Sequence, residues 1–267
     1  MLKALLIIFV RPLMRLDLFL VEKNYFKSRH QAQIEIKNNR IKVNKDIITK
    51  PSFQVSESDD ITVLTPYNPY VSMGGLKLEK ALTAFGIDCK DTVVCDVGAS
   101  TGGFTDCVLK RGAKHVKTVD VGHHQIDATL AAHPQTTITE GLNFLDTDDG
   151  FFKAIDFIVM DVSFTSSLPL IFHAYKHTHV PLIALIKPQF ETMDTPSSGV
   201  IKNKKQHLKI LKNYQNTLNQ HNIYIQALTY SPIKGKRGNI EFLCLISKKK
   251  NMVDLDSIVD EAHKALK

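Results

Sequence analysis

A strand that runs directly into a glycine-rich turn constrains the fold of this chain more than any other feature of its sequence. Residues 93–104 read VVCDVGASTGGF, an apolar run with one acid that is followed by Gly98, Gly102 and Gly103. Glycine reaches backbone conformations that other residues avoid, and its missing side chain lets a ligand lie against the main chain. The segment therefore predicts a ligand-binding turn at the end of a buried strand.

A second apolar segment, residues 116–120 (VKTVD), ends in an acid about twenty residues further on, where the acid of a nucleotide site holds the ribose hydroxyls. We expect Asp120 in that role. The glycine spacing G-x-x-x-G-G is not the dinucleotide fingerprint G-x-G-x-x-G, and the sequence contains no phosphate-binding G-x-x-x-x-G-K-[ST]. Both observations favour S-adenosylmethionine over NAD or ATP, because it carries adenosine but no pyrophosphate.

Beyond residue 72, strand-like segments alternate with helical ones, which predicts a largely parallel sheet with helices on both faces. The last two strands are only about ten residues apart, too few for a helical crossover, so they should be antiparallel. A seven-stranded, mostly parallel sheet with one antiparallel strand is typical of the α/β class I (Rossmann-like) methyltransferase fold. The expected strands are 92–97, 115–120, 136–140, 156–161, 181–186, 223–229 and 240–246, and the expected helices are 76–85, 103–112, 124–132 and 204–219.

The cysteines and the apolar segments argue against a metal site, a disulfide-bonded protein and a membrane-spanning one. The four cysteines are scattered and form no pair at metal or disulfide spacing, so we expect no metal and a reducing cytoplasm. The apolar run at residues 4–10 is too short to cross a bilayer, which needs about twenty residues. We expect residues 1–13 to be an N-terminal extension ahead of Met14, and residues 248–267 to form a tail with a peripheral helix.

The excess positive charge lies near the start of the chain. Residues 1–50 hold 11 Lys and Arg against 4 Asp and Glu. Ser28 and Gln31 form a capping-box pattern that predicts a helix from Arg29 to about residue 38, with Ala32 and Ile36 facing a core. Its polar residues, Arg29, Gln33, Lys37 and then Arg40, fall on one stripe. Such a stripe fits either a solvated face or a surface for a polyanion such as RNA.

Residues 14–64, which include RLDLFLVEKNYFKSRHQAQIEIKNNRIKVN, resemble the S4 RNA-binding domain, a small α+β module. The resemblance implies contacts that read the shape and phosphates of folded RNA more than its sequence. Residues 65–72 would then be a linker to a domain spanning 73–247. The implied RNA-binding residues are Arg15, Lys27, Ser28, Arg29, Lys37, Arg40 and Lys42.

Four charged residues fall where strand ends should converge, in GGLKLEKAL (Lys77), FIVMD (Asp161), LIKPQF (Lys187) and IEFLCLI (Glu241). Each alone is most simply a salt-bridge partner. Together, beside a cofactor turn, they suit methyl transfer to a hydroxyl, in which a lysine orients the oxygen and takes its proton. We expect Lys187 to be that base, with Asp161 to position it and Lys77 to assist orientation. The neighbouring carboxylates oppose the pKa shift that burial favours. Lys80 competes with Lys77 for the remaining lysine position.

The order Lys, Asp, Lys, Glu with DVGASTGGF, MDVSF, IKPQF and GNIEF is similar to FtsJ-like 2′-O-ribose methyltransferases. The S4-like module ahead of VSMGGLKLEKAL further resembles the TlyA (haemolysin A) family. The resemblance implies methylation of cytidine 2′-hydroxyls in 23S and, as a further candidate, 16S ribosomal RNA. It also implies catalytic roles for Lys77, Asp161, Lys187 and Glu241, and cofactor contacts by Asp96, Gly98, Ala99, Ser100, Thr101, Gly102, Gly103, Asp120, Asn143 and Asp161.

Alternative classes of function remain. One is a ribosome assembly factor that binds RNA without catalysis, and another is a membrane-lytic protein, which the family's name suggests. A methyltransferase of small molecules or proteins is a third, and the basic N-terminal module disfavours it. Relatives usually have Arg where this chain has Met73, so an RNA or linker contact could differ. We expect a monomer whose partners are ribosomal RNA or ribosomal subunits.

Overall fold

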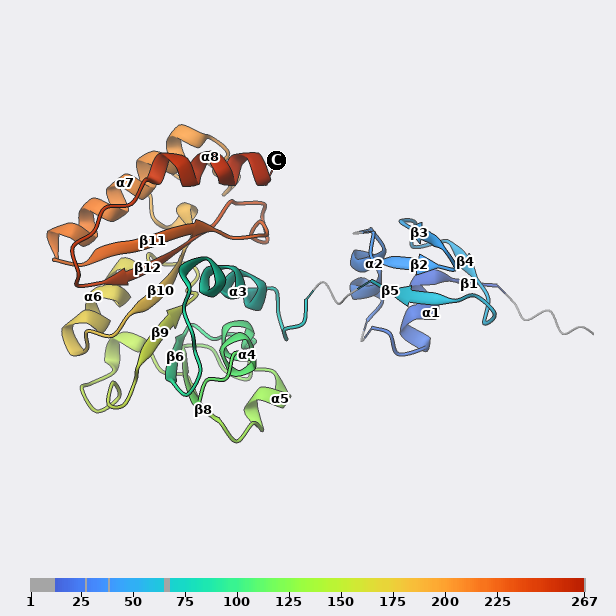
Figure 1. Ribbon diagram of the computed structural model, residues 1–267, viewed down its shortest axis with the longest axis horizontal. Helices are drawn as coiled ribbons and strands as arrows, with labels where there is room; N and C mark the ends of the chain where they lie inside the picture. Colours follow the sequence, from blue (N-terminus) through green and yellow to red (C-terminus); the bar gives the residue numbers. More distant parts are fainter. Residues whose placement is uncertain (1–12, 27, 38, 65–67, 267) are drawn as a thin grey trace, which may run out of the picture. The chain divides into compact units, whose positions relative to one another are not determined.

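The computed structural model describes residues 13–26, 28–37, 39–64 and 68–266. Lys27, residues 1–12 of the expected extension and residues 65–67 of the expected linker lie outside the described residues. The chain divides into two compact units, Met1–Pro69 and Tyr70–Lys267, which are labelled by element in Figure 1.

The first unit combines two helices with short antiparallel strands. Helix α2 begins as predicted, because Ser28 Oγ accepts a hydrogen bond from Gln31 N at 3.2 Å and so caps the first turn of the helix. Ala32 and Ile36 are fully buried, which confirms the expected inner face of this helix. The elements are β1 (Met14–Arg15), α1 (Leu16–Glu22), α2 (Arg29–Lys37), β2 (Ile41–Val43), β3 (Asp46–Ile48), β4 (Gln54–Val55) and β5 (Ile61–Val63), with pairing β1-β4 and β3-β2-β5.

The second unit is built on one seven-stranded sheet of order β11-β12-β10-β9-β6-β7-β8. Strand β12 runs antiparallel to both of its neighbours, and the other pairs are parallel. This confirms the expected mostly parallel sheet with one reversed strand. The strands are β6 (Val93–Val97), β7 (His115–Asp120), β8 (Thr136–Glu140), β9 (Phe157–Met160), β10 (Leu182–Ile186), β11 (Tyr224–Tyr230) and β12 (Phe242–Ser247).

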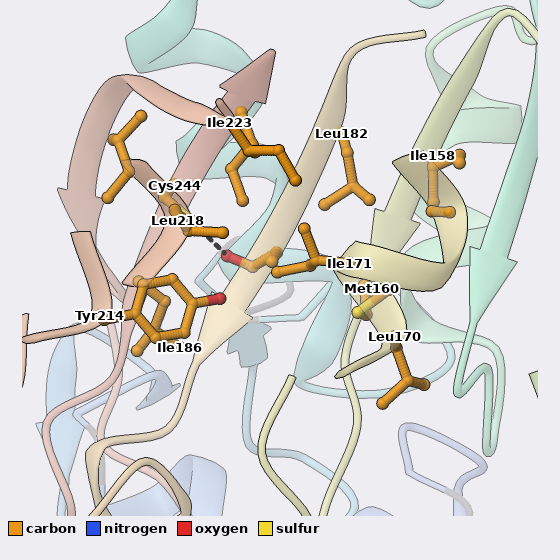
Figure 2. Packing of buried hydrophobic residues seen from close by; sticks show 14 of the residues in the cluster. Ile158, Met160, Leu170, Ile171, Leu182, Ile186, Tyr214, Leu218, Ile223 and Cys244 are labelled. Carbon is orange, nitrogen blue, oxygen red and sulfur yellow. Dashed lines mark hydrogen bonds between the residues drawn. The ribbon is translucent and has the colours of Figure 1, made fainter. Parts of the chain in front are cut away.

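Helices cover both faces of this sheet. Alternate residues of each central strand point to opposite faces, so that Ile158 and Met160 of β9 join one core and Phe157 and Val159 join the other. Figure 2 shows part of the first core, where side chains from α6 and α7 pack on the strands. The helices are α3 (Gly74–Phe85), α4 (Gly103–Lys110), α5 (Ala128–Ala131), α6 (Leu168–His177), α7 (Lys204–Gln220) and α8 (Leu255–Ala265), with short turns η1 (Phe144–Asp146) and η2 (Pro188–Phe190).

Three helices differ from expectation. Helix α6 falls in a stretch where none was expected, and it supplies the crossover that the parallel strands β9 and β10 require. Helix α5 is a single turn, shorter than the expected span 124–132. Helix α8 is not a peripheral addition, because Leu255, Val259 and Ala262 are buried in the same core as α6 and α7.

Candidate active site

The charged residues singled out from the sequence meet at one edge of the sheet. Asp161 and Lys187 directly follow the parallel strands β9 and β10, so both leave the sheet at its carboxyl edge. Glu241 precedes β12, and because β12 is reversed its start lies at that same edge. Lys77 lies in the first turn of α3. The reversed strand is therefore what brings the fourth charge to the site.

These four residues form two ion pairs. Lys77 Nζ lies 2.6 Å from Glu241 Oε2, and Lys187 Nζ lies 2.6 Å from Asp161 Oδ1. The lysine side chains are only 11% and 10% exposed. Burial of a lysine is costly unless an opposite charge compensates it, so each pair holds an ammonium group at a fixed place on the edge.

Lys80 does not compete for this site. Its Nζ lies 3.1 Å from the centroid of the Tyr230 ring, where burial lowers the pKa of the ammonium group. Lys77, one turn earlier, is the lysine that reaches a carboxylate of the edge. The geometry therefore supports Lys77 over Lys80.

The glycine turn has an unusual backbone. Gly98, Ser100 and Gly102 have φ values of +78°, +48° and +91°, in the left-handed region that glycine enters most easily. Ala99 is buried, whereas Ser100 and Thr101 are exposed at the tip. The turn thus folds back on itself directly after β6.

Protein atoms occupy the space that side chains on these glycines would need. A Cβ on Gly98 would lie 2.8 Å from the carbonyl oxygen of Asp161, and one on Gly103 would lie 3.0 Å from Gly75 N. The turn consequently touches both the end of β9 and the start of α3. This places the glycine turn, Asp161 and the helix that carries Lys77 in direct contact.

Acids lie beneath and beside the turn. Asp96 is fully buried in β6, where its Oδ2 accepts from Thr105 Oγ1 at 2.6 Å and its Oδ1 has no partner among the described residues. Burial, helped by the charge of Asp161, raises the pKa of Asp96 to about 7. Asp120 accepts from Ser100 N at 2.8 Å and from Gly122 N at 2.7 Å, so it holds the tip of the turn. Asn143 caps the short turn η1 through Leu145 N.

Three residues of this edge were missed in the sequence. Ser163 Oγ accepts from Lys187 Nζ at 2.6 Å. Phe164 has φ +68°, and the residue is 90% exposed although large apolar side chains are usually buried. Glu191 accepts hydrogen bonds from Ser166 and Ser167. Ser163 and Phe164 belong to the MDVSF motif, but only the backbone shows which way each of them points.

In the first unit, a buried acid organises two of the predicted RNA-binding arginines. Arg15 Nε and Arg29 Nε lie 3.0 and 2.9 Å from the carboxylate of Asp17, which is fully buried, and Gln33 Nε2 donates to it at 2.7 Å. Burial alone raises the pKa of Asp17, but the hydrogen bonds from Arg15, Gln33 and Arg29 outweigh it and hold the pKa well below its ordinary value. Asp17 was not expected in this role.

The other predicted RNA-binding residues have separate environments. Ser28 caps α2. Lys37 is exposed in the last turn of α2, and Lys42 is half-buried on β2. Arg40 Nε lies 3.9 Å from Glu35 Oε2. The unit therefore presents cations from β1, α2 and β2, but it does not gather all of them at one point.

The sheet order, the reversed β12, and the glycine turn with charged residues at the carboxyl edge together define a class I methyltransferase domain. The profile of the FtsJ-like methyltransferase family matches residues 70–248, and that of the S4 domain matches residues 14–61. The chain belongs to the FtsJ-like methyltransferase family and carries an S4 domain ahead of its methyltransferase domain.

Named relatives resemble almost the whole chain. Hemolysin A of Brachyspira hyodysenteriae is 38% identical over 237 residues, which cover 86% of this chain and 98% of the relative. The 16S/23S rRNA (cytidine-2′-O)-methyltransferase TlyA of Mycobacterium tuberculosis is 31% identical over 264 residues, which cover 94% and 97%. A solved structure from Streptococcus thermophilus that carries the name hemolysin has a TM-score of 0.72 and 32% identity, and covers 95% of this chain and 97% of its own.

None of the helices in the described part of the chain is both long and apolar enough to cross a bilayer.

Proposed function

We propose that this chain transfers the methyl group of S-adenosylmethionine to a cytidine 2′-hydroxyl of ribosomal RNA. The observation that carries the proposal is the pair of buried ion pairs, Lys77–Glu241 and Lys187–Asp161, at the carboxyl edge of a methyltransferase sheet. The names of the TlyA relatives support cytidine in 23S and 16S rRNA as the target. We further propose that the protein acts as a monomer in the cytoplasm.

The described residues fit the cofactor. The left-handed glycine turn folds over the end of β6, and Asp120 lies at the end of β7, the position from which an acid reaches ribose hydroxyls. Each carboxylate oxygen of Asp120 accepts one backbone N–H and keeps a lone pair for a hydroxyl. When bound, S-adenosylmethionine supplies a methyl group on a positively charged sulfur. We assign Asn143 a place near the adenine, and the remaining cofactor contacts to Asp96, Asp161 and residues 98–103.

Lys187 is assigned to orient the ribose oxygen and to receive its proton. Its Nζ is fixed between Asp161 Oδ1 and Ser163 Oγ, each 2.6 Å away. An ammonium group has no lone pair, so Lys187 must release a proton before it accepts one. Asp161 Oδ1 is a carboxylate acceptor within reach of that proton. Lys77, held by Glu241, places a second ammonium group at the same edge of the sheet.

We assign contacts with the RNA to both units. The basic S4 unit supplies phosphate contacts, which position the substrate without reading sequence. At the methyltransferase edge, Phe164 presents an exposed ring next to Ser163, the residue bonded to Lys187. Exposed aromatic rings stack on unpaired bases of RNA. We assign Phe164 to the base of the target nucleotide.

The test is methyl transfer by Lys187→Ala. Labelled S-adenosylmethionine is incubated with ribosomal subunits from cells that lack the enzyme, and 2′-O-methyl groups are then mapped on the rRNA. We expect the variant to lose about 10²- to 10⁴-fold in rate, the usual contribution of a positioned acid or base. Calorimetry should show nearly unchanged affinity for S-adenosylmethionine.

Lys80→Ala is the matched control, because Lys80 lies one turn from Lys77 but contacts Tyr230. It should keep wild-type transfer. Wild-type turnover by Lys187→Ala would remove this lysine from the mechanism. A wild-type protein that binds subunits but methylates none of them would instead be an assembly factor.

A further inference from the structure

Two turns at the carboxyl edge, residues 161–167 after β9 and residues 187–191 after β10, are joined by the side chain of Glu191. Its Oε2 accepts from Ser166 Oγ at 2.5 Å, and its Oε1 accepts from Ser167 N and Ser167 Oγ at 2.8 Å each. Because β9 and β10 are neighbouring parallel strands, the two turns leave the sheet side by side. Glu191 ties the end of one turn to the end of the other.

Glu191 is not an ordinary salt-bridge partner. Within the part of the chain that the structure describes, no Lys, Arg or His lies within ion-pair distance of its carboxylate. Its donors are instead one amide and two hydroxyls, and hydrogen bonds to an ionised acceptor are stronger than neutral ones. The negative charge also lies at the N-terminus of the ten-residue helix α6, where it is favourable.

The turn that Glu191 holds contains a strained residue. Phe164 is in the left-handed region, which is unfavourable for a bulky side chain, and its exposed ring lies outside the core, 5.8 Å from the ring of Phe190. Such a conformation persists only where the surroundings fix it. Ser163, on one side of Phe164, is bonded to Lys187, and Ser166 and Ser167, on the other side, are bonded to Glu191.

We propose that Glu191 is a positioning residue for methyl transfer. By holding Ser166 and Ser167 it keeps Ser163 on Lys187 and keeps the ring of Phe164 turned outward. Without the carboxylate, Phe164 is free to relax to an ordinary backbone conformation, and Lys187 loses one of its two fixed neighbours. The catalytic part of this inference rests on the function proposed above, whereas the anchoring of the turn does not.

Hydrogen exchange of the full-length protein tests the anchoring without any activity. In Glu191→Ala, the amides of residues 161–168 should exchange faster than in the wild type. Tyr214→Phe is the matched control, because it removes the 2.7 Å bond between Tyr214 and Ser167 but leaves all three bonds of Glu191. It should lower the melting temperature and leave exchange of residues 161–168 unchanged. Unchanged exchange in Glu191→Ala would overturn the anchoring.

Steady-state kinetics test the catalytic part, with ribosomal subunits as substrate. Glu191→Ala should lower kcat about 10- to 100-fold, as expected when a reacting group is displaced by about 1 Å, with unchanged affinity for S-adenosylmethionine. Glu191→Gln, which keeps an acceptor oxygen for Ser167, should recover much of the loss. Glu191→Ala with wild-type kcat would overturn the positioning role and leave the proposed function intact.

A double-mutant cycle with Phe164→Ala asks whether Glu191 acts through the turn. If it does, the double variant should lose little more activity than the more impaired single variant, because the two residues act as one unit. Fully additive losses would overturn the coupling between them. If the wild type itself methylates no ribosomal RNA but the exchange result holds, the anchoring stands and the proposed function falls.

Discussion

At the scale of single residues, two buried aspartates show how surroundings set the charge of the same side chain. Asp17 is fully buried, yet two guanidinium groups and an amide hold its pKa well below the ordinary value. Asp96 is equally buried with a hydroxyl donor and no cation, and its pKa rises to about 7. Burial acts in the same direction on both, so the partners decide the outcome.

Asp17→Asn should destabilise the first unit in a pH-dependent way. A carboxyl whose pKa is lowered by folding contributes stability above its unfolded pKa of about 3.9, and that contribution is lost as pH falls toward the folded pKa. We expect a loss of about 1–3 kcal/mol of local unfolding free energy at pH 7, typical of hydrogen bonds to a charged group. Hydrogen exchange of the α2 amides measures it.

The difference between wild type and Asp17→Asn should shrink below about pH 4. Asn44→Ala, which breaks exposed bonds to Asp59 and Asp60 in the same unit, serves as a control of the exchange of α2. A difference that stays constant from pH 3 to pH 7 would show that the charge of Asp17 is not what stabilises α2.

At the scale of elements, local sequence patterns were sufficient to predict a strand pairing or a helix cap that depends on residues close together in the chain. The capping of α2 by Ser28 and the antiparallel pairing of β11 with β12 could be predicted, because one follows from a spacing of three and the other from a short connection. Helix α6 was not expected, although its buried residues, Leu170, Ile171, Ala174 and Tyr175, recur at helical spacing. Its existence follows from the topology of β9 and β10.

The candidate site was predictable to a similar degree. Lys77, Asp161, Lys187 and Glu241 could be named because each lies next to a strand or helix end. The pairing of Asp161 with Lys187 could also be expected, because both follow parallel strands, whereas that of Lys77 with Glu241 depends on which strand is reversed. Phe164 was missed because nothing in the sequence marks a phenylalanine as exposed and left-handed. Glu191 was missed because its partners, Ser166 and Ser167, lie 25 and 24 positions earlier.

Gly103→Ala should separate the starts of α3 and α4. A Cβ at this position would lie 2.2 Å from Ser72 Oγ and 3.0 Å from Gly75 N, and the second contact is backbone that cannot rotate away. Overpacking of this kind typically costs about 1–3 kcal/mol. Thermal unfolding of the full chain, with affinity for S-adenosylmethionine measured alongside, provides the check.

The matched control is Gly74→Ala at the start of α3, where a Cβ would meet its nearest atom at an ordinary 3.4 Å. It should be nearly neutral. Equal melting temperatures for the two variants would mean that α3 and α4 can move apart without loss of stability.

At the scale of the whole molecule, the excess positive charge of the chain lies within residues 1–50. A polyanion therefore gains most of its electrostatic attraction from the first unit, and the methyltransferase unit contributes chemistry at an edge of paired charges. Attraction to phosphates weakens with salt as condensed counterions are released.

Replacing Lys37 and Lys42 by Gln should weaken RNA binding and flatten its salt dependence. Both are outside the Asp17 cluster, so the fold of the unit should survive. Each lost phosphate contact lowers the slope of log K against log salt by about 0.7–0.9. Affinity for a large-subunit rRNA transcript, measured between about 50 and 200 mM salt, gives the slope.

Lys23→Gln is the control, because Lys23 is paired with Glu57 at 2.9 Å. Its slope should match the wild type. If the Lys37 and Lys42 variant also keeps the wild-type slope, the exposed face of α2 is an ordinary solvated surface.

The pair formed by Lys77 and Glu241 joins positions 164 residues apart, the first helix of the second unit and its last strand. A chain emerging from the ribosome during its own synthesis therefore has Lys77 exposed long before its counter-charge exists. The ion pair can form only when β12 takes its place between β10 and β11. If the function proposed above holds, a nascent copy cannot methylate the ribosome that is making it until this last strand is in place.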